Sequence, residues 1–187
     1  MAITTLNNRS INRSDTASSG QKWTATSATA SDFQAGGKIG QVVQAIKTDT
    51  FTSAATSYTD LTGITVDITP SATSSKVLVL CSLTLAVSTG GLPHLKLLRD
   101  STDLGLGDTA GSRARLTTSY VIPSTDVLAA VPIIYLDSPS STNALTYKVQ
   151  GFAYSTNTIY VNRTIDDADE VYRSRGSSTI TVMEILA

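Results

Sequence analysis

The sequence predicts an all-β protein whose antiparallel strands form a sandwich or a barrel. Of its 187 residues, 24 are Ser and 29 are Thr, and the branched Cβ of Thr suits the pleated surface of a sheet. From residue 41 onward, short segments of alternating apolar and polar residues recur between turn residues. No stretch has the 3.6-residue apolar period of a helix. Regular short strands of this kind are typical of sandwiches and barrels.

The alternation predicts nine or ten strands. The clearest is residues 64–70, where Ile64, Val66 and Ile68 alternate with polar residues and Pro70 ends the run, because proline cannot donate to a ladder. A proline at position 132 indicates an edge strand or a bulge. The predicted segments are 41–49, 57–63, 64–70, 76–87, 94–100, 113–122, 127–137, 144–154, 158–164 and 178–186.

Residues 76–87, KVLVLCSLTLAV, form the longest apolar stretch. One face carries six apolar residues, and the opposite face carries Leu78 and Leu80. A strand that is apolar on both faces is expected inside a sandwich or at a subunit interface. Residues 178–186 carry five apolar residues and predict a central, buried strand. Residues expected in either a trimer interface or the inter-sheet core are therefore Leu78, Leu80, Ile180, Val182 and Ile185.

Composition disfavours several classes of function. The 14 basic and 15 acidic side chains nearly balance, so no basic excess points to nucleic acid. No apolar run reaches the length of a membrane helix, and the first residues lack the pattern of a signal peptide. The single histidine, His94, leaves no material for a catalytic triad, and no cofactor-binding motif is present. The single cysteine, Cys81, is expected to be a buried thiol.

One dense carboxylate cluster lies in IDDADEVY, residues 165–172. Several oxygen ligands could hold calcium, but the spacing is not that of a calcium loop, and we favour a solvated acidic turn without metal. That turn pairs Asp166, Asp167, Asp169 and Glu170 with Arg163, Arg173 and Arg175.

Four tyrosines fall in the last third of the chain. Aromatic rings can stack on sugars, so a host glycan site is an alternative to ordinary cross-strand packing, which we favour. These residues are Tyr147, Tyr154, Tyr160 and Tyr172.

Residues 1–37 form a separate segment that is poor in apolar side chains and ends in AGGK at 35–38. Such a segment cannot build a core of its own, so it is expected either to be a linker or, as we favour, an extended arm that docks on a partner protein. Residues 38–187 then form the β-domain. The expected docking residues of the arm are Ile3, Leu6, Arg9, Ile11, Arg13, Trp23 and Phe33, with the aromatic pair as anchors.

Several stretches resemble a known group of sequences, namely small virion structural proteins of tailed phages of aquatic bacteria. They include NNRSINRSDTASSGQKWTATSATASDFQ near the start, LLRDSTDLGLGD, YLDSPSSTNALTYKVQ and VNRTIDDADEVYRSRGSSTITVMEIL at the end. The resemblance covers nearly the whole chain and implies a decoration-like or fibre-like protein. It also implies a jelly-roll sandwich like the tumour-necrosis-factor and C1q heads, and a homotrimer.

Together these features predict a non-enzymatic protein of the virion surface that is assembled in the host cytoplasm and carries no cofactor. The favoured role is a capsid decoration (cement) protein whose arm straps onto the major capsid protein. The alternative is a short tail fibre or receptor-binding tip that plugs into a tail adaptor and recognises host glycans. A polysaccharide-cleaving enzyme is disfavoured, because the carboxylates at 166–170 are too close in sequence to supply a separated catalytic pair.

Overall fold

A computed structural model describes residues 21–25, 31–35, 38–88, 91–120 and 127–187. These residues form strands and connecting loops and contain no helix, and therefore none that could span a membrane. The strands are β1 (Gln21–Ala25), β2 (Ser31–Ala35), β3 (Ile39–Lys47), β4 (Phe51–Ser53), β5 (Thr59–Ile68), β6 (Lys76–Val87), β7 (Pro93–Arg99), β8 (Thr102–Leu104), β9 (Thr118–Ser119), β10 (Ala129–Asp137), β11 (Leu145–Ala153), β12 (Ile159–Val161) and β13 (Ser178–Ile185).

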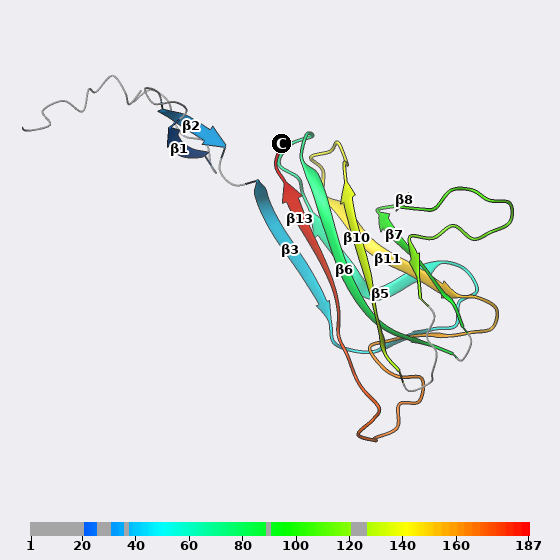
Figure 1. Cartoon of the computed structure of the whole chain (residues 1–187). Coiled ribbons are helices and arrows are strands. Elements are labelled where there is room, and N and C mark those ends of the chain that lie inside the picture. The colour runs from blue at the N-terminus through cyan, green and yellow to red at the C-terminus, as the bar shows by residue number, and fades with distance from the viewer. Residues whose placement is uncertain (1–20, 26–30, 36–37, 89–90, 121–126) are drawn as a thin grey trace, which may run out of the picture.

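Two antiparallel sheets make up the β-domain (Figure 1). The first sheet has the order β3-β13-β6-β10, with β4 and β12 continuing the lines of β3 and β13. The second sheet has the order β5-β11-β7, followed by β8 and β9 on the free edge of β7. Strands β3, β5, β6 and β7 alternate between the two sheets, and the last strand, β13, returns to lie between β3 and β6. This connectivity is that of a jelly roll. The predicted all-β jelly-roll sandwich is confirmed.

The core lies between the two sheets, and β6 contributes most to it. Its inward residues from Val77 to Val87 are at most 4% exposed, as the period of two requires. Cys81 is one of them, and burial raises the pKa of its thiol to about 12, so the predicted inert core cysteine is confirmed. Strand β13 pairs with both β3 and β6, which confirms that the last strand is central.

Some expected strand boundaries are wrong. Residues 57–63 and 64–70 belong to one strand, β5, which is interrupted by a bulge at Gly63. Of the strand expected at 113–122, only Thr118–Ser119 forms within the described residues. The preceding residues form a loop instead, where the Arg115 side chain donates to the Gly107 carbonyl at 2.7 Å. Pro132 lies in β10, at the edge of its sheet, as its inability to donate predicts.

Part of the segment 1–37 pairs with itself. Strands β1 and β2 form an antiparallel ladder in which Trp23 lies opposite Phe33. Residues of high strand propensity at these positions favour such a hairpin. Within the segment, Gln21–Ala25 and Ser31–Ala35 are thus paired strands. The extended docking arm expected over residues 1–37 stays a prediction, and the rest of the segment lies outside the described residues.

Buried polar groups tie the ends of the strands together. The carboxylate of Glu184 in β13 accepts from the backbone N–H and hydroxyl of Ser71 (2.6 Å each) and from the Ser75 hydroxyl (2.8 Å). The amide of Gln41 in β3 donates to its other oxygen at 3.1 Å. Burial alone would raise the pKa of Glu184, but these hydrogen bonds outweigh it and lower the pKa from 4.5 to about 2.

We expect Glu184→Gln to lower the free energy of unfolding at pH 7 by about 2 kcal/mol, because the amide cannot accept all of these bonds. The lowered pKa contributes stability that is present above pH 4.5 and is lost as the pH falls toward 2. The difference between variant and parent should therefore shrink by pH 3. Urea unfolding at pH 7, 5 and 3 measures it, with Glu170→Gln as the exposed control. A difference that stays constant with pH would contradict this role.

Candidate interaction surface

The outer side of the first sheet exposes an apolar surface, which we call the outer face. Cross-strand pairing arranges its side chains in three rows across β3, β13, β6 and β10. The rows are Val42–Met183–Leu78–Leu136, Gln44–Thr181–Leu80–Ile134 and Ile46–Thr179–Ser82–Pro132.

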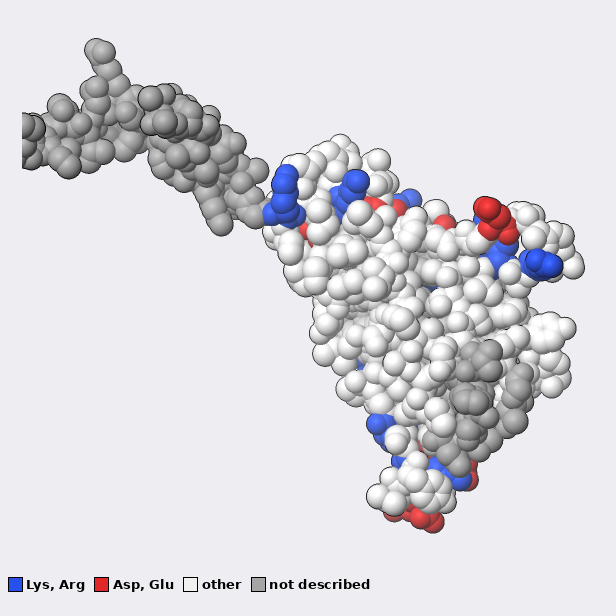
Figure 2. Space-filling model, in the orientation of Figure 1, with Lys and Arg blue, Asp and Glu red and all other residues white. Residues whose placement is uncertain are grey.

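The three rows of the outer face carry no charged residue, and the nearest charge on this side of the sheet is Lys76, in the next row opposite Ile185. The aliphatic side chains of the rows are unusually exposed. Ile134 is 72% exposed, Ile46 59%, Val42 54% and Leu136 49%. Figure 2, drawn in the orientation of Figure 1, shows a broad area without charged side chains between the charged groups at the two ends of the domain. Scattered exposed aliphatics are ordinary, whereas a contiguous group on one face is typical of an interaction site.

The structure divides the residues expected in a trimer interface or in the core. Ile180 and Val182 are fully buried between the sheets. Leu78 and Leu80 point the other way and are half-buried within the outer face. Ile185 lies at the end of β13, half-buried, between β3 and β6.

Sequence analysis missed the exposed residues of β3 and β10. The signal was present, because QVVQAIK and PIIYLD carry apolar residues at both odd and even positions. In such strands the apolar side chains of one face pack in the core, and those of the other face are buried only if another element or protein packs against them.

The docking residues expected in the arm are only partly covered by the structure. Ile3, Leu6, Arg9, Ile11 and Arg13 lie outside the described residues. Trp23 and Phe33 are opposite each other in the β1–β2 ladder, and their docking role stays a prediction.

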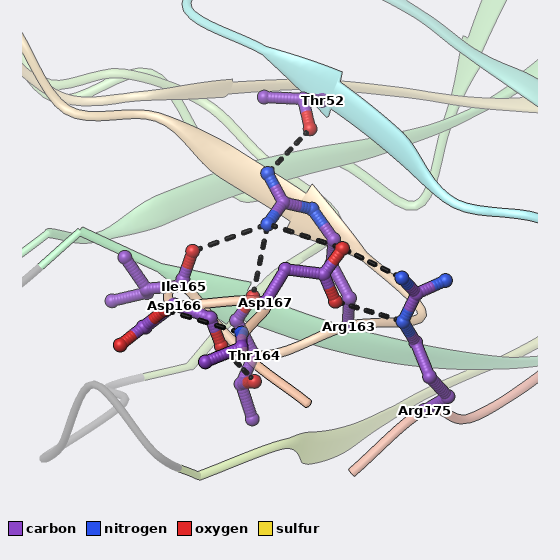
Figure 3. Close-up of polar contacts among 8 residues, drawn as sticks. Thr52, Arg163, Thr164, Ile165, Asp166, Asp167 and Arg175 are labelled. Atoms are coloured by element: carbon purple, nitrogen blue, oxygen red, sulfur yellow. Dashed lines mark hydrogen bonds and ion pairs between the residues drawn. The ribbon is translucent and has the colours of Figure 1, made fainter. Parts of the chain in front are cut away.

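The acidic cluster at 166–170 forms a loop in which arginines hold the carboxylates (Figure 3). Arg175 binds Asp167 through two bonds of 2.8 and 2.6 Å, and Arg173 pairs with Asp166 at 3.1 Å. Arg163 reaches from the same loop to the Thr52 hydroxyl in β4 at 3.4 Å. No group of residues suited to hold a metal ion occurs among the described residues. For Asp166 and Asp167 the loop thus matches the paired acidic turn favoured from the sequence, whereas the pairing expected for Asp169 and Glu170 stays a prediction.

The four tyrosines of the last third do not gather into one site. Tyr147 is buried in the core, where its hydroxyl donates to Asp137 at 2.7 Å, and burial raises its pKa. Tyr160 stacks with Arg163. Tyr154 and Tyr172 are exposed on different loops, so these four residues do not share the single glycan site that was the alternative to ordinary packing.

A different aromatic group lies on the outer side of the second sheet. The ring of Phe152 contacts those of Tyr58 and His94 edge-on, with centroids 4.8 Å apart in both pairs. The ammonium of Lys96 lies 4.2 Å from the centre of the Tyr58 ring. Burial lowers the pKa of His94, which favours its neutral form. Sequence analysis missed this group because its members are far apart along the chain.

Comparison with known proteins gives only distant likenesses. No protein-family model and no curated protein matches the sequence. A chain in the structure of infectious bursal disease virus Gt strain is 13% identical, with a TM-score of 0.44 over 88% of this chain and 42% of that one. A chain of the infectious bursal virus derived T=1 particles is 12% identical, with a TM-score of 0.43 over 88% of this chain and 40% of that one.

A chain of the infectious bursal disease virus VP2 subviral particle is 11% identical, with a TM-score of 0.39 over 88% of this chain and 41% of that one. This chain thus spans about two-fifths of the length of the viral chains that it matches. At these values the likeness does not establish a shared role.

Addition of millimolar calcium should leave the Tm of the protein unchanged, because arginines already pair with Asp166 and Asp167. A scanning calorimetry experiment with calcium and with a chelator tests this, with magnesium as the ionic control. A calcium-specific rise in Tm would show that the cluster binds the ion.

Proposed function

We propose that this chain is a non-enzymatic structural protein of a virion that assembles into a homotrimer through its outer face. The observation that carries the proposal is the uncharged outer face of β3, β13, β6 and β10, with four aliphatic side chains about half or more exposed. Covering the exposed part of each of these side chains returns about 1 kcal/mol.

A second copy of the chain is the partner that suits this surface. A charged partner would find no counter-charge among the residues of the three rows, and its own charges would lose water without compensation. Another copy offers the same uncharged, apolar side chains. Oligomers of identical subunits are the commonest assemblies of soluble proteins.

Within the virion, we propose the role of a capsid decoration protein of a tailed phage, located at the virion surface. The basis is the resemblance of the sequence to phage structural proteins and the low content of apolar side chains in residues 1–37, which predicts a docking arm rather than part of a core. In this role the arm binds the major capsid protein. Three arms on one trimer bind with an avidity that a single arm lacks.

A short tail fibre or receptor-binding tip is the second candidate. The aromatic group of Tyr58, His94 and Phe152 favours it, because half-buried aromatic side chains next to polar groups suit the recognition of host glycans. In that role residues 1–37 would bind a tail adaptor.

Ile134→Asp should convert the trimer into monomers. The side chain is 72% exposed within one subunit, so the fold should tolerate Asp, whereas a charge buried at each interface costs about 3 kcal/mol, or roughly 100-fold in affinity. Sedimentation velocity across a range of concentrations measures the change. Val171→Asp, at a fully exposed loop position, is the matched control and should stay trimeric. A parent protein that is monomeric at micromolar concentration would refute the assembly.

Co-sedimentation with phage heads that lack this protein tests the decoration role. The full chain should bind the heads, and the double variant Trp23→Ala, Phe33→Ala should bind at least tenfold more weakly while remaining a trimer. Binding to isolated tails and not to heads would favour the fibre role instead. Equal binding by parent and variant would refute docking through these anchors.

A further inference from the structure

The second sheet contains a hollow that its own strand pairing creates. Lys148 in β11 lies opposite Thr65 in β5, and Gln150 lies opposite Asp60. Strand β11 thus advances by two residues while β5 advances by five (from 60 to 65). The extra residues of β5 form a bulge at Gly63, whose φ of +86° suits glycine.

This hollow has a volume of about 330 Å³, at the lower end of the range for small-ligand sites. Its base includes Leu61 and Ile64, both only 1% exposed. Polar side chains stand around that base. The full lining is Asp60, Leu61, Thr62, Gly63, Ile64, Thr65, Thr146 and Lys148. Three threonines, an aspartate and a lysine therefore line one small space, and the Thr146 hydroxyl donates to Asp67 at 2.6 Å, so it can only accept from a ligand.

Hydrogen bonds hold the charged members of the lining in place. Asp60 accepts from the Lys148 ammonium at 2.9 Å and from the Gln150 amide at 2.8 Å. Burial alone would raise the pKa of Asp60, but these two bonds outweigh it and lower the pKa. The carboxylate is thus ionised at neutral pH and is paired with an adjacent cation. A ligand that suits this hollow needs many hydroxyl groups and no net charge.

The aromatic group lies next to the hollow on the same side of the sheet. Phe152 is two residues beyond Gln150 along β11, and Tyr58 is two residues before Asp60. Side chains on one face of a strand repeat about every 6.6 Å, which is close to the size of one sugar ring. The C–H groups of a pyranose form an apolar patch that packs against aromatic rings.

We propose that the hollow and the adjacent aromatic group form a binding site for a neutral carbohydrate. One pyranose occupies the hollow, where Asp60, Lys148 and the threonines exchange hydrogen bonds with its hydroxyls. The next sugar packs against the group of Tyr58 and Phe152. This site is on the sheet opposite the outer face, so it remains available in the trimer and does not depend on the virion position of the protein.

The test uses the full chain and four sugars, glucose, galactose, mannose and N-acetylglucosamine, each displayed on a polymer. We expect the parent protein to bind at least one of them and the matching free disaccharide to compete. Backbone amide NMR signals of residues 60–65 and 146–150 should shift on titration with that disaccharide. Failure to bind any of the four probes would overturn the proposal.

Two variants locate the site. Asp60→Asn and Phe152→Ala should each weaken binding at least tenfold. The matched controls, Asp108→Asn and Tyr172→Ala, change another aspartate and another aromatic residue, both at exposed loop positions, and should bind like the parent. Phe152→Ala removes a packed ring, so the Tm of this variant is measured as well. If Phe152→Ala does not fold, the result for Asp60→Asn alone decides whether the site is correctly assigned. Unchanged binding by Asp60→Asn would refute the assignment.

Discussion

The first half of strand β6 is apolar on both faces at Val77–Leu80, and the arrangement of the molecule depends on this. Its inward residues, from Val77 to Val87, are almost completely buried by the second sheet. Its outward residues Leu78 and Leu80 have only the neighbouring side chains of β13 and β10 beside them. A strand of this kind requires cover from both directions. The second sheet buries the inward face of β6, and in our proposal a second copy of the chain buries the outward face.

Hydrogen bonds from buried polar side chains hold the ends of the strands in place, because apolar packing in the core is not directional. Asn162, which is fully buried with a φ of +62°, donates to the carbonyls of Lys47 and Asp49 at 2.9 Å each. The side-chain oxygen of Asn162 accepts from the Ser178 hydroxyl at 2.7 Å. Asn adopts this left-handed conformation more readily than most residues. One side chain thus joins the turn after β3 to the start of β13, and leaving any of these groups unpaired would be costly.

The sequence predicts the features that follow from alternation within one strand. The core face of β6, the central β13 and the buried Cys81 all belong to this class. Features that depend on pairing between distant segments are not predictable in this way. The bulge opposite Lys148 and Gln150 exists only in the pairing of β5 with β11, and the contacts of Phe152 with Tyr58 and His94 join three separate segments. The alternation of residues within one strand contains no information on the bulge or on these aromatic contacts.

The outer sides of the two sheets carry different side chains, and this difference determines which sheet is buried in an assembly. The rows of the first sheet are uncharged, whereas the second sheet carries ion pairs between Lys96 and Asp103 and between Lys148 and Asp60. Water solvates such pairs at little cost, but it does not solvate exposed aliphatic side chains. An assembly that buries the first sheet therefore leaves the second sheet, with its hollow and aromatic group, facing solvent and any molecule that approaches the particle.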